Sequence, residues 1–280
     1  MSPTWHVSDP GVRWTVRDPR ELALRIRLRA VRMVASQGFG YLGQALSAAE
    51  QVAAVFAAAR PGVDRLVCSP GHYIIAPFAA AAELGLVDDD AIATYGQNGS
   101  AFEAIGTERS PVVDYTCGSL GQGLSGALGF ALADRLRGSD ARIFTMLSDG
   151  EMEEGQVWEA ALFAAHHRLD RLVVLLDANN SQVDGPVDSI TTIEPIAAKW
   201  SAFGWHVRDL DGHDVDAVSA ALAEADAQAG RPSVLICRTS ITHGLDCLPP
   251  DADGHFIKLP PELAKAAVEE LTGKLEALHA

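Results

Sequence analysis

Residues 142–185 read RIFTMLSDGEMEEGQVWEAALFAAHHRLDRLVVLLDANNSQVDG. In this stretch, two runs rich in Val, Leu, Ile and Phe flank a segment whose apolar residues have helical spacing. A strand, a helix and a second strand in this order favour two parallel strands joined by a crossover helix. The stretch therefore predicts the unit from which an α/β sheet is built.

The remainder of the chain continues this alternation. Ser47 and Glu50 have the spacing of a capping box, so the second helix is expected to begin at Ser47. Strands rich in Val, Ile and Leu, each followed by a helix, predict an α/β fold with a parallel sheet flanked by helices on both faces. Further strands are expected at 65–69, 200–212 and 232–240, and helices at 20–37, 47–60, 74–85, 120–136, 154–168, 216–228 and 262–278.

Length and charge limit the organisation and the partners. Over 280 residues we expect an N-terminal arm at 1–19, one domain at 20–248, and a C-terminal linker and helix at 249–280. The chain has 37 acidic and 22 basic residues, which gives a formal net charge of −15. A surface of that sign repels phosphate backbones, so nucleic acids and membrane surfaces are disfavoured as partners and small-molecule substrates are favoured.

The cellular location is predicted from the cysteines and the N-terminus. The four cysteines form no CxxC pair, a pattern that suits free thiols in a reducing compartment. The N-terminus has neither the basic nor the apolar region of a signal peptide. No apolar run approaches the roughly 20 residues that a membrane-spanning helix needs. These features predict a cytoplasmic protein.

Oxygen-bearing side chains stand where the two strands of the opening stretch end. Asp149 and Gly150 follow the first strand, and Asn179 follows the second, 30 positions after Asp149. Open parallel sheets bind ligands at the carboxyl ends of their strands. A carboxylate and a carboxamide oxygen at that edge suit Mg²⁺, which keeps coordination positions for phosphates. The alternative, an Asp-Gly turn that only caps a helix, explains Asp149 but leaves Asn179 without a role.

Several motifs in the chain resemble one enzyme family. Asp149-Gly150 followed after 28 intervening residues by Asn179 resembles the thiamine diphosphate and Mg²⁺ motif, and the surrounding sequence is similar to transketolases. Ser69-Pro70-Gly71-His72-Tyr73 and the segment CGSLGQGLS at 117–125 match in the order of that family. The resemblance covers about residues 20–245 and implies the thiamine diphosphate-binding fold.

The resemblance also implies a second polypeptide. Full-length transketolases are roughly twice as long, and nothing after Val234 leaves room for another α/β domain. The chain resembles the N-terminal, diphosphate-binding subunit of a split transketolase. A separate C-terminal transketolase-like subunit would then supply the glutamate that activates the aminopyrimidine of the cofactor, in an α₂β₂ assembly.

The family's functional residues can be carried over position by position. The resemblance implies that Asp149 and Asn179 ligate Mg²⁺ by their side chains and Ser181 by its carbonyl. It implies cofactor contacts for Gly150 at the diphosphate and for Gly118 and Leu120 at the aminopyrimidine. It further implies catalytic positions for His72 and His243, near the diphosphate and thiazolium, and for Glu154, in an acidic network between subunits. A histidine can donate or accept a proton near neutral pH, as such a reaction requires.

Two departures from the family concern the substrate. Phe39 and Thr107 stand where transketolases carry histidines that contact the sugar. We therefore expect ketol transfer with a less hydroxylated or differently shaped donor or acceptor. Two other functions stay open: a 2-oxo acid decarboxylase or acyl-transfer component, because VDGPV at 183–187 resembles pyruvate dehydrogenase E1, and a non-catalytic partner subunit.

A GxGxxG pattern at 121–126 could indicate a dinucleotide-binding fold. The preceding DYTC is a poor strand, and no acidic residue ends a clear strand about 20 positions later. Close helix packing next to a cofactor loop explains these glycines better.

Overall fold

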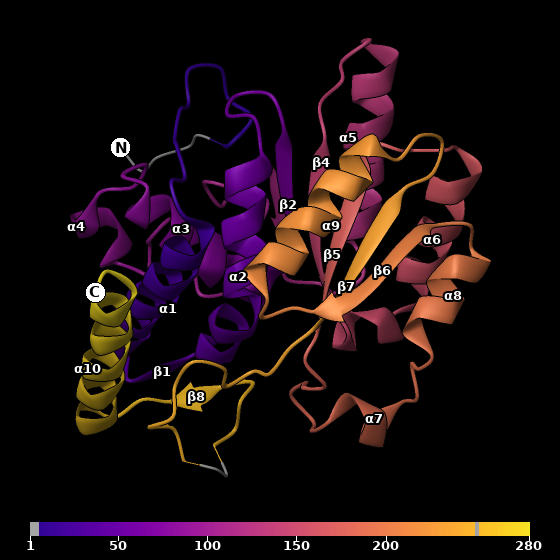
Figure 1. The fold of residues 1–280 in the computed structure, drawn as a ribbon. Helices are drawn as coiled ribbons and strands as arrows, with labels where there is room; N and C mark the ends of the chain where they lie inside the picture. Colours follow the sequence, from indigo (N-terminus) through magenta and orange to yellow (C-terminus); the bar gives the residue numbers. More distant parts are fainter. Residues whose placement is uncertain (1–5, 250–251) are drawn as a thin grey trace.

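A parallel six-stranded sheet forms the centre of the structure, a computed structural model that describes residues 6–249 and 252–280 (Figure 1). The strands are arranged in the order β3-β2-β4-β5-β7-β6, and a separate pair, β1 and β8, is antiparallel. The strands are β1 (Phe39–Gly40), β2 (Arg65–Pro70), β3 (Tyr115–Cys117), β4 (Ile143–Ser148), β5 (Leu172–Ala178), β6 (His206–Asp211), β7 (Ser233–Arg238) and β8 (Ile257–Lys258).

Helices cover both faces of this sheet, as the sequence predicted (Figure 1). The buried cluster on one face includes residues of α1, α2, α3 and α9, with α1 packed on α2 and α3, and the cluster on the other face includes residues of α5, α6 and α8. The helices are α1 (Pro19–Ala35), α2 (Leu42–Ala58), α3 (Ile75–Glu83), α4 (Asp89–Ile92), α5 (Gly123–Leu136), α6 (Gly155–His166), α7 (Val187–Ile190), α8 (Ile196–Ala202), α9 (Val215–Ala227) and α10 (Pro261–Leu278), with 3₁₀ turns at Gly71–Ile74 and Gly150–Glu153.

The central strands β4 and β5 are buried along their whole lengths. Their parallel register pairs Ser148 with Asp177. Because neighbouring parallel strands end at the same edge, this register places the polar residues after β4 beside those after β5.

Three expectations about elements were wrong. Helix α2 begins at Leu42, five residues before the expected start, and Ser47 lies buried within it. The Ser47 hydroxyl therefore does not cap the helix; it donates a hydrogen bond to Asp177. The stretch expected as a strand at 200–212 begins with the end of α8, and only its second part forms β6. The poor strand DYTC contains β3, which is three residues long and lies at the sheet edge.

The GxGxxG glycines allow close packing of α5 on the sheet. A Cβ on Gly123 would lie 2.4 Å from the Cα of Ser69 in β2, and one on Gly126 would lie 2.9 Å from the Tyr115 ring. The pattern therefore has a packing role at the start of a helix that lies against the sheet.

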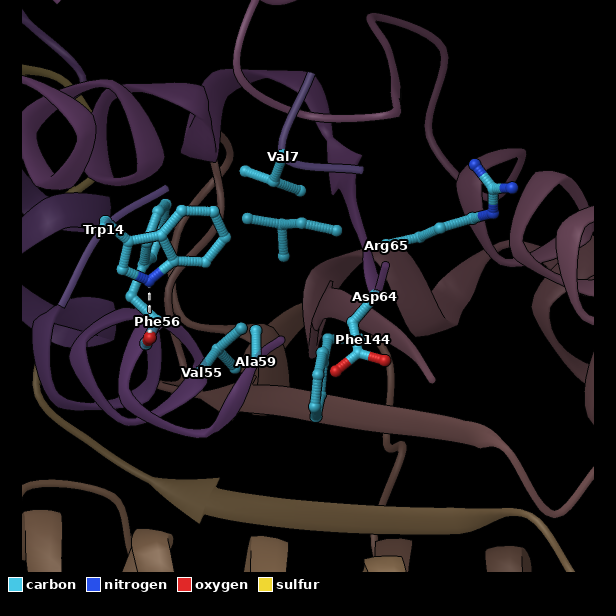
Figure 2. A pocket seen from close by; sticks show the side chains of 9 residues that line it. Val7, Trp14, Val55, Phe56, Ala59, Asp64, Arg65 and Phe144 are labelled. Atoms are coloured by element: carbon cyan, nitrogen blue, oxygen red, sulfur yellow. Dashed lines mark hydrogen bonds between the residues drawn. The ribbon is translucent and has the colours of Figure 1, made fainter. Parts of the chain in front are cut away.

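Described residues on both sides of 20–248 pack on this core. Figure 2 shows Val7 and Trp14 above Phe56 in a small pocket near the start of β2, where the Trp14 indole donates to the Phe56 carbonyl at 2.8 Å. Residues 1–5 of the expected arm and residues 250–251 of the expected linker lie outside the described part of the chain. Helix α10 lies beside α1 (Figure 1) and buries Ala267 and Leu271. Among the described residues, no helix is long and apolar enough to span a bilayer.

A buried ion pair connects α1 to α2. The Arg27 guanidinium donates to both oxygens of Glu50 at 2.6 Å and to the Leu46 carbonyl. Burial alone would raise the pKa of Glu50, but the Arg27 charge, with hydrogen bonds from Arg27 and His213, lowers it to about 2. Glu50 is therefore ionised in the folded protein well below the pH at which it protonates in the unfolded chain.

This ion pair predicts an acid-sensitive contribution to stability. Since the folded pKa is depressed, the contribution is complete above about pH 4.5 and is lost as the pH falls towards 2. Glu50→Ala leaves Arg27 buried without its counter-charge and should cost about 3–5 kcal/mol at pH 7. Urea unfolding at pH 7 and pH 3 measures both values, with the exposed Glu276→Ala as the control. A cost that stayed the same at pH 3 would contradict this assignment.

Candidate cofactor site

The Asp149 carboxylate connects the segments that follow β4 and β5. Its Oδ1 accepts the Gly150 N–H at 2.9 Å, and its Oδ2 accepts the Asn180 N–H at 2.6 Å. Only 3% of the residue is exposed. Burial and the nearby negative charge of Asp177 raise the pKa of Asp149 to about 7. A cation bound beside this carboxylate would stabilise its ionised form.

The Asn179 side chain is held in one orientation. Its Nδ2 donates to Asp177 at 2.7 Å and to the Tyr73 hydroxyl at 2.8 Å, while its Oδ1 accepts the Ser181 N–H at 2.9 Å. Because the amide nitrogen donates to the buried Asp177 and Tyr73 side chains, the amide oxygen faces the loop that follows β5. Asn180 has a φ of +56°, a left-handed conformation that asparagine tolerates and that turns the chain back towards Asp149.

Asp177 organises this end of the sheet, and the sequence analysis missed it. The residue is fully buried and accepts five side-chain hydrogen bonds. The donors are Ser47 (2.6 Å) and Gln51 (2.9 Å) from α2, Tyr73 (2.8 Å), Asn179 (2.7 Å) and Thr239 (2.6 Å). One sequence signal could have found it: an acidic residue inside the apolar strand LVVLLDA, since buried charges need dedicated partners.

The loop carrying Gly118 and Leu120 is fastened to the turn that follows Asp149. Glu151 in that turn accepts the Gly121 N–H at 2.7 Å and the Ser69 hydroxyl at 2.6 Å. Glu154 is exposed and directly precedes α6. A Cβ added to Gly121 would lie 2.8 Å from the Glu154 Cβ. The structure thus places Glu154, predicted for the subunit interface, beside the loop that carries Gly118 and Leu120.

His72 lies among aromatic rings that lead outward from Asn179. It follows β2 and precedes Tyr73, whose hydroxyl contacts Asn179. The His72 ring is 5.0 Å from the His255 ring and 5.3 Å from the Tyr41 ring. Burial and the neighbouring His255 lower the pKa of His72 to about 3. His72 is therefore a neutral imidazole at pH 7, able to donate or accept a proton through its nitrogens.

His255 is a second site histidine that the sequence analysis missed, because it lies in a stretch treated as a linker. The Gln44 side chain donates to its carbonyl at 3.1 Å. Gly43 allows this approach, since a Cβ there would lie 2.0 Å from the Gly254 carbonyl oxygen. Only a long-range contact between α2 and residues 254–256 identifies His255, and no local motif marks it.

His243 has different neighbours from His72. Its ring stacks on His213, with centroids 3.5 Å apart and an angle of 10° between the planes. Burial and the Arg27 charge lower the pKa of His243 to about 4. Glu50, His213 and His243 are close enough to suggest a metal site. However, Arg27 binds both Glu50 oxygens, and parallel rings cannot aim their lone pairs at one ion.

Phe39 and Thr107 also have defined surroundings. The Phe39 ring in β1 lies 5.5 Å from the ring of Phe256, which directly precedes β8, and half of Phe39 is exposed. Phe256 in turn contacts Tyr41 at 5.1 Å. Thr107 lies in the loop before β3, where its hydroxyl donates to Glu103 at 2.9 Å. The aromatic series from Tyr73 to Phe39 therefore ends at an exposed, apolar rim.

The residues at the ends of β4 and β5 fit a divalent cation bound to a diphosphate. Asp149 and Asn179 offer hard oxygen atoms from two adjacent segments, the ligand type that Mg²⁺ prefers. No described Lys or Arg hydrogen bonds to Asp149, Glu151 or Asp177, so the negative charge there has no protein counter-ion in contact. Gly150 adds no side chain at the place where a phosphate would approach.

A parallel sheet with this strand order and an oxygen-rich strand edge defines a class of cofactor-binding α/β domains. The model of the family "Transketolase, thiamine diphosphate binding domain" matches residues 19–260, and the chain belongs to this family.

Individual relatives agree with the family match. A transketolase family protein of Sinorhizobium fredii is 38% identical over 253 residues, which cover 86% of this chain and 91% of that protein. The 6-deoxy-6-sulfo-D-fructose transketolase subunit SqwG of a Clostridium strain is 38% identical over 256 residues, covering 88% of this chain and 93% of that subunit. The crystal structure of transketolase from Campylobacter jejuni superimposes with a TM-score of 0.83 at 25% identity, over 92% of this chain and 43% of that one.

The Asp177 network predicts a large effect of a small substitution. Asp177→Asn replaces one acceptor oxygen by an NH₂ group among five donors and should destabilise the protein by about 2–3 kcal/mol. Urea unfolding measures the change. The same substitution at the exposed Asp90 should change the free energy of unfolding by less than about 0.5 kcal/mol. Equal, small effects of both substitutions would show that Asp177 does not hold the site together.

Proposed function

We propose that this chain is the N-terminal subunit of a transketolase-like enzyme that transfers a two-carbon ketol unit from a ketose-type donor to an aldehyde acceptor. It uses thiamine diphosphate and Mg²⁺ and is active together with a separate C-terminal subunit. The observation that carries the proposal is the approach of the Asp149 and Asn179 segments at the tips of β4 and β5, where Asp149 accepts the N–H next to Asn179. The family match supports it.

In this proposal each residue has a defined task. Asp149 and Asn179 hold Mg²⁺ by their side chains and Ser181 holds it by its carbonyl, while Gly150 leaves room for the diphosphate. When bound, thiamine diphosphate supplies the carbanion that cleaves and forms carbon–carbon bonds next to a carbonyl. Gly118 and Leu120 position the aminopyrimidine through their backbone. His72, held neutral by burial, exchanges protons with substrate oxygens.

The position of the second histidine differs from the sequence-based prediction. We propose His255 as the partner of His72, because the two rings are 5.0 Å apart within the aromatic series that leads from Tyr73 to Phe39. His243, which the resemblance suggested, stacks on His213 beside the Arg27–Glu50 ion pair. We still propose Glu154 for a subunit interface, because its exposed position beside Gly121 leaves it accessible to a second subunit.

The partner subunit is supported by the relatives. SqwG, whose length this chain nearly matches, is itself named a subunit, and the Campylobacter jejuni transketolase is more than twice as long as the matched region. We propose an α₂β₂ assembly in which the second chain supplies the activating glutamate. The four free cysteines are consistent with a cytoplasmic location.

A metal-ligand substitution tests the cofactor assignment. Calorimetric titration of the assembled enzyme should show thiamine diphosphate binding in Mg²⁺ and none in EDTA. Asp149→Ala removes a charged ligand and should weaken this binding at least about tenfold. Asp90→Ala, on the exposed α4, is the matched control. Unchanged affinity of Asp149→Ala would refute the metal assignment, and absence of binding in the wild type would favour a non-catalytic partner subunit.

Donor profiling tests the reaction and the role of Phe39. We expect ketol transfer to an aldehyde without CO₂ release from pyruvate, and little turnover without the second subunit. Phe39→His adds a hydrogen-bond donor at the rim and should raise kcat/KM for highly hydroxylated ketoses about tenfold relative to the wild type. Leu136→His, at an exposed position on α5, is the control. Release of CO₂ from pyruvate would instead establish the decarboxylase alternative.

A further inference from the structure

Glu151 is a fully buried acid two residues after the predicted metal ligand Asp149. It lies in the 3₁₀ turn Gly150–Glu153 after β4, and its own N–H donates to the Ser148 hydroxyl at 3.3 Å. Its Oε1 accepts two hydrogen bonds, from the Ser69 hydroxyl at 2.6 Å and from the Gly121 N–H at 2.7 Å. Within the described part of the chain, its Oε2 has no hydrogen-bond partner.

This arrangement is unfavourable for stability alone. A carboxyl group buried without a cation loses its hydration, and an oxygen without a partner adds to that cost. Among the described residues, the buried acids away from this strand edge contact an arginine, as Glu50 contacts Arg27 and Asp64 contacts Arg142. Glu151 has no such contact among the described residues, so its placement calls for a local reason other than charge pairing.

The two bonds to Oε1 connect three segments that the proposed function uses. Ser69 is the second-last residue of β2 and lies three residues before His72, Gly121 belongs to the loop of Gly118 and Leu120, and Glu151 follows Asp149 and Gly150. Since one atom accepts both hydrogen bonds, neither the loop nor the end of β2 can move away from the turn without losing a bond to Glu151.

The loop has few other means of staying in place. Gly121 has a φ of +85° and carries no side chain that could pack, and a Cβ there would collide with Glu154. A Cβ on Gly123 would lie 2.4 Å from the Ser69 Cα. The Gly121 N–H is therefore the backbone group that ties this loop to the turn, and the Glu151 carboxylate is its acceptor.

We propose that Glu151 is a positioning residue that sets the distance between the aminopyrimidine loop at 118–122 and the metal-binding turn at 149–150. This inference rests on the proposed function, because it assigns the two segments to opposite ends of one cofactor. Glu151 does not touch the cofactor; it acts through the Gly121 amide and the Ser69 hydroxyl.

Hydrogen exchange of the Gly121 amide, measured in the cofactor-free protein, tests the contact directly. Glu151→Ala should speed this exchange at least about tenfold, and Glu151→Gln, which keeps an acceptor oxygen, should restore most of the protection. In the assembled enzyme, Glu151→Ala should weaken thiamine diphosphate binding about tenfold or more while kcat at saturating cofactor stays within about threefold. Ser69→Ala, which leaves the carboxylate in place, should give a smaller effect in the same direction.

Asp114 provides a control for the loss of an acid whose side chain is buried. Its carboxylate also accepts one backbone N–H, from Leu66, and one serine hydroxyl, from Ser8, but it lies 3.5 Å from an Arg65 nitrogen and at the opposite end of β2 and β3. Asp114→Ala should lower stability without changing Gly121 exchange or cofactor affinity.

The outcomes separate the inference from the proposed function. Wild-type cofactor binding that Glu151→Ala leaves unchanged overturns the positioning role while the proposed function stands. Equal loss of affinity in Asp114→Ala and Glu151→Ala also overturns it, because the effect is then one of general stability. No binding by the wild-type assembly overturns both, even if Gly121 exchange responds to Glu151.

Discussion

The carboxylate of Asp177, buried at the end of the central strand β5, is the constraint around which the site is built. A buried charge without a cation persists only if its oxygens are fully hydrogen-bonded. Five side chains from α2, the turn after β2, the segment after β5 and the segment after β7 meet this requirement. The need to satisfy one carboxylate therefore places three distant chain segments around the strand edge beside the segment that follows β5, and it fixes the Asn179 amide with its oxygen outward.

The same constraint connects Asn179 to the aromatic side of the site. Tyr73 bonds to both Asp177 and Asn179, so the position of its ring follows from the polar network. His72 precedes it and contacts Tyr41 and His255. A substitution at Asp177 would therefore alter the positions of the His72 and His255 imidazoles through the Tyr73 ring, although neither of these histidines hydrogen bonds to the carboxylate. The rim formed by Phe39 and Phe256 is the part of the aromatic series that is least tied to the network, and under the proposed function substitutions there would alter substrate preference without disturbing the residues proposed to hold the cofactor.

The sequence predicts the features that depend on local pattern and fails where long-range contacts decide. Alternating apolar strands and helices predict the parallel sheet, and the Asp149–Asn179 spacing predicts two polar strand ends that the register brings side by side. Ser47 and Glu50 fit a capping box, yet both are recruited by partners distant in sequence, Asp177 and Arg27. His255 reaches the site only because Gly43 lets another segment approach α2. Asp177 itself is visible as an acid in an apolar strand, but its five donors are not.

The distribution of charge at the strand edge argues for what the proposed cation does. Asp149, Glu151 and Asp177 are all buried there, and no described lysine or arginine hydrogen bonds to any of them. Two of the three already serve structural ends: Asp177 gathers the surrounding segments, and Glu151 holds the 118–122 loop. Asp149 accepts only two backbone N–H groups, and its raised pKa reflects burial near Asp177. A divalent ion at Asp149 would offset the repulsion between these acids. Binding of the ion with the cofactor would therefore also remove the electrostatic repulsion that destabilises the free subunit.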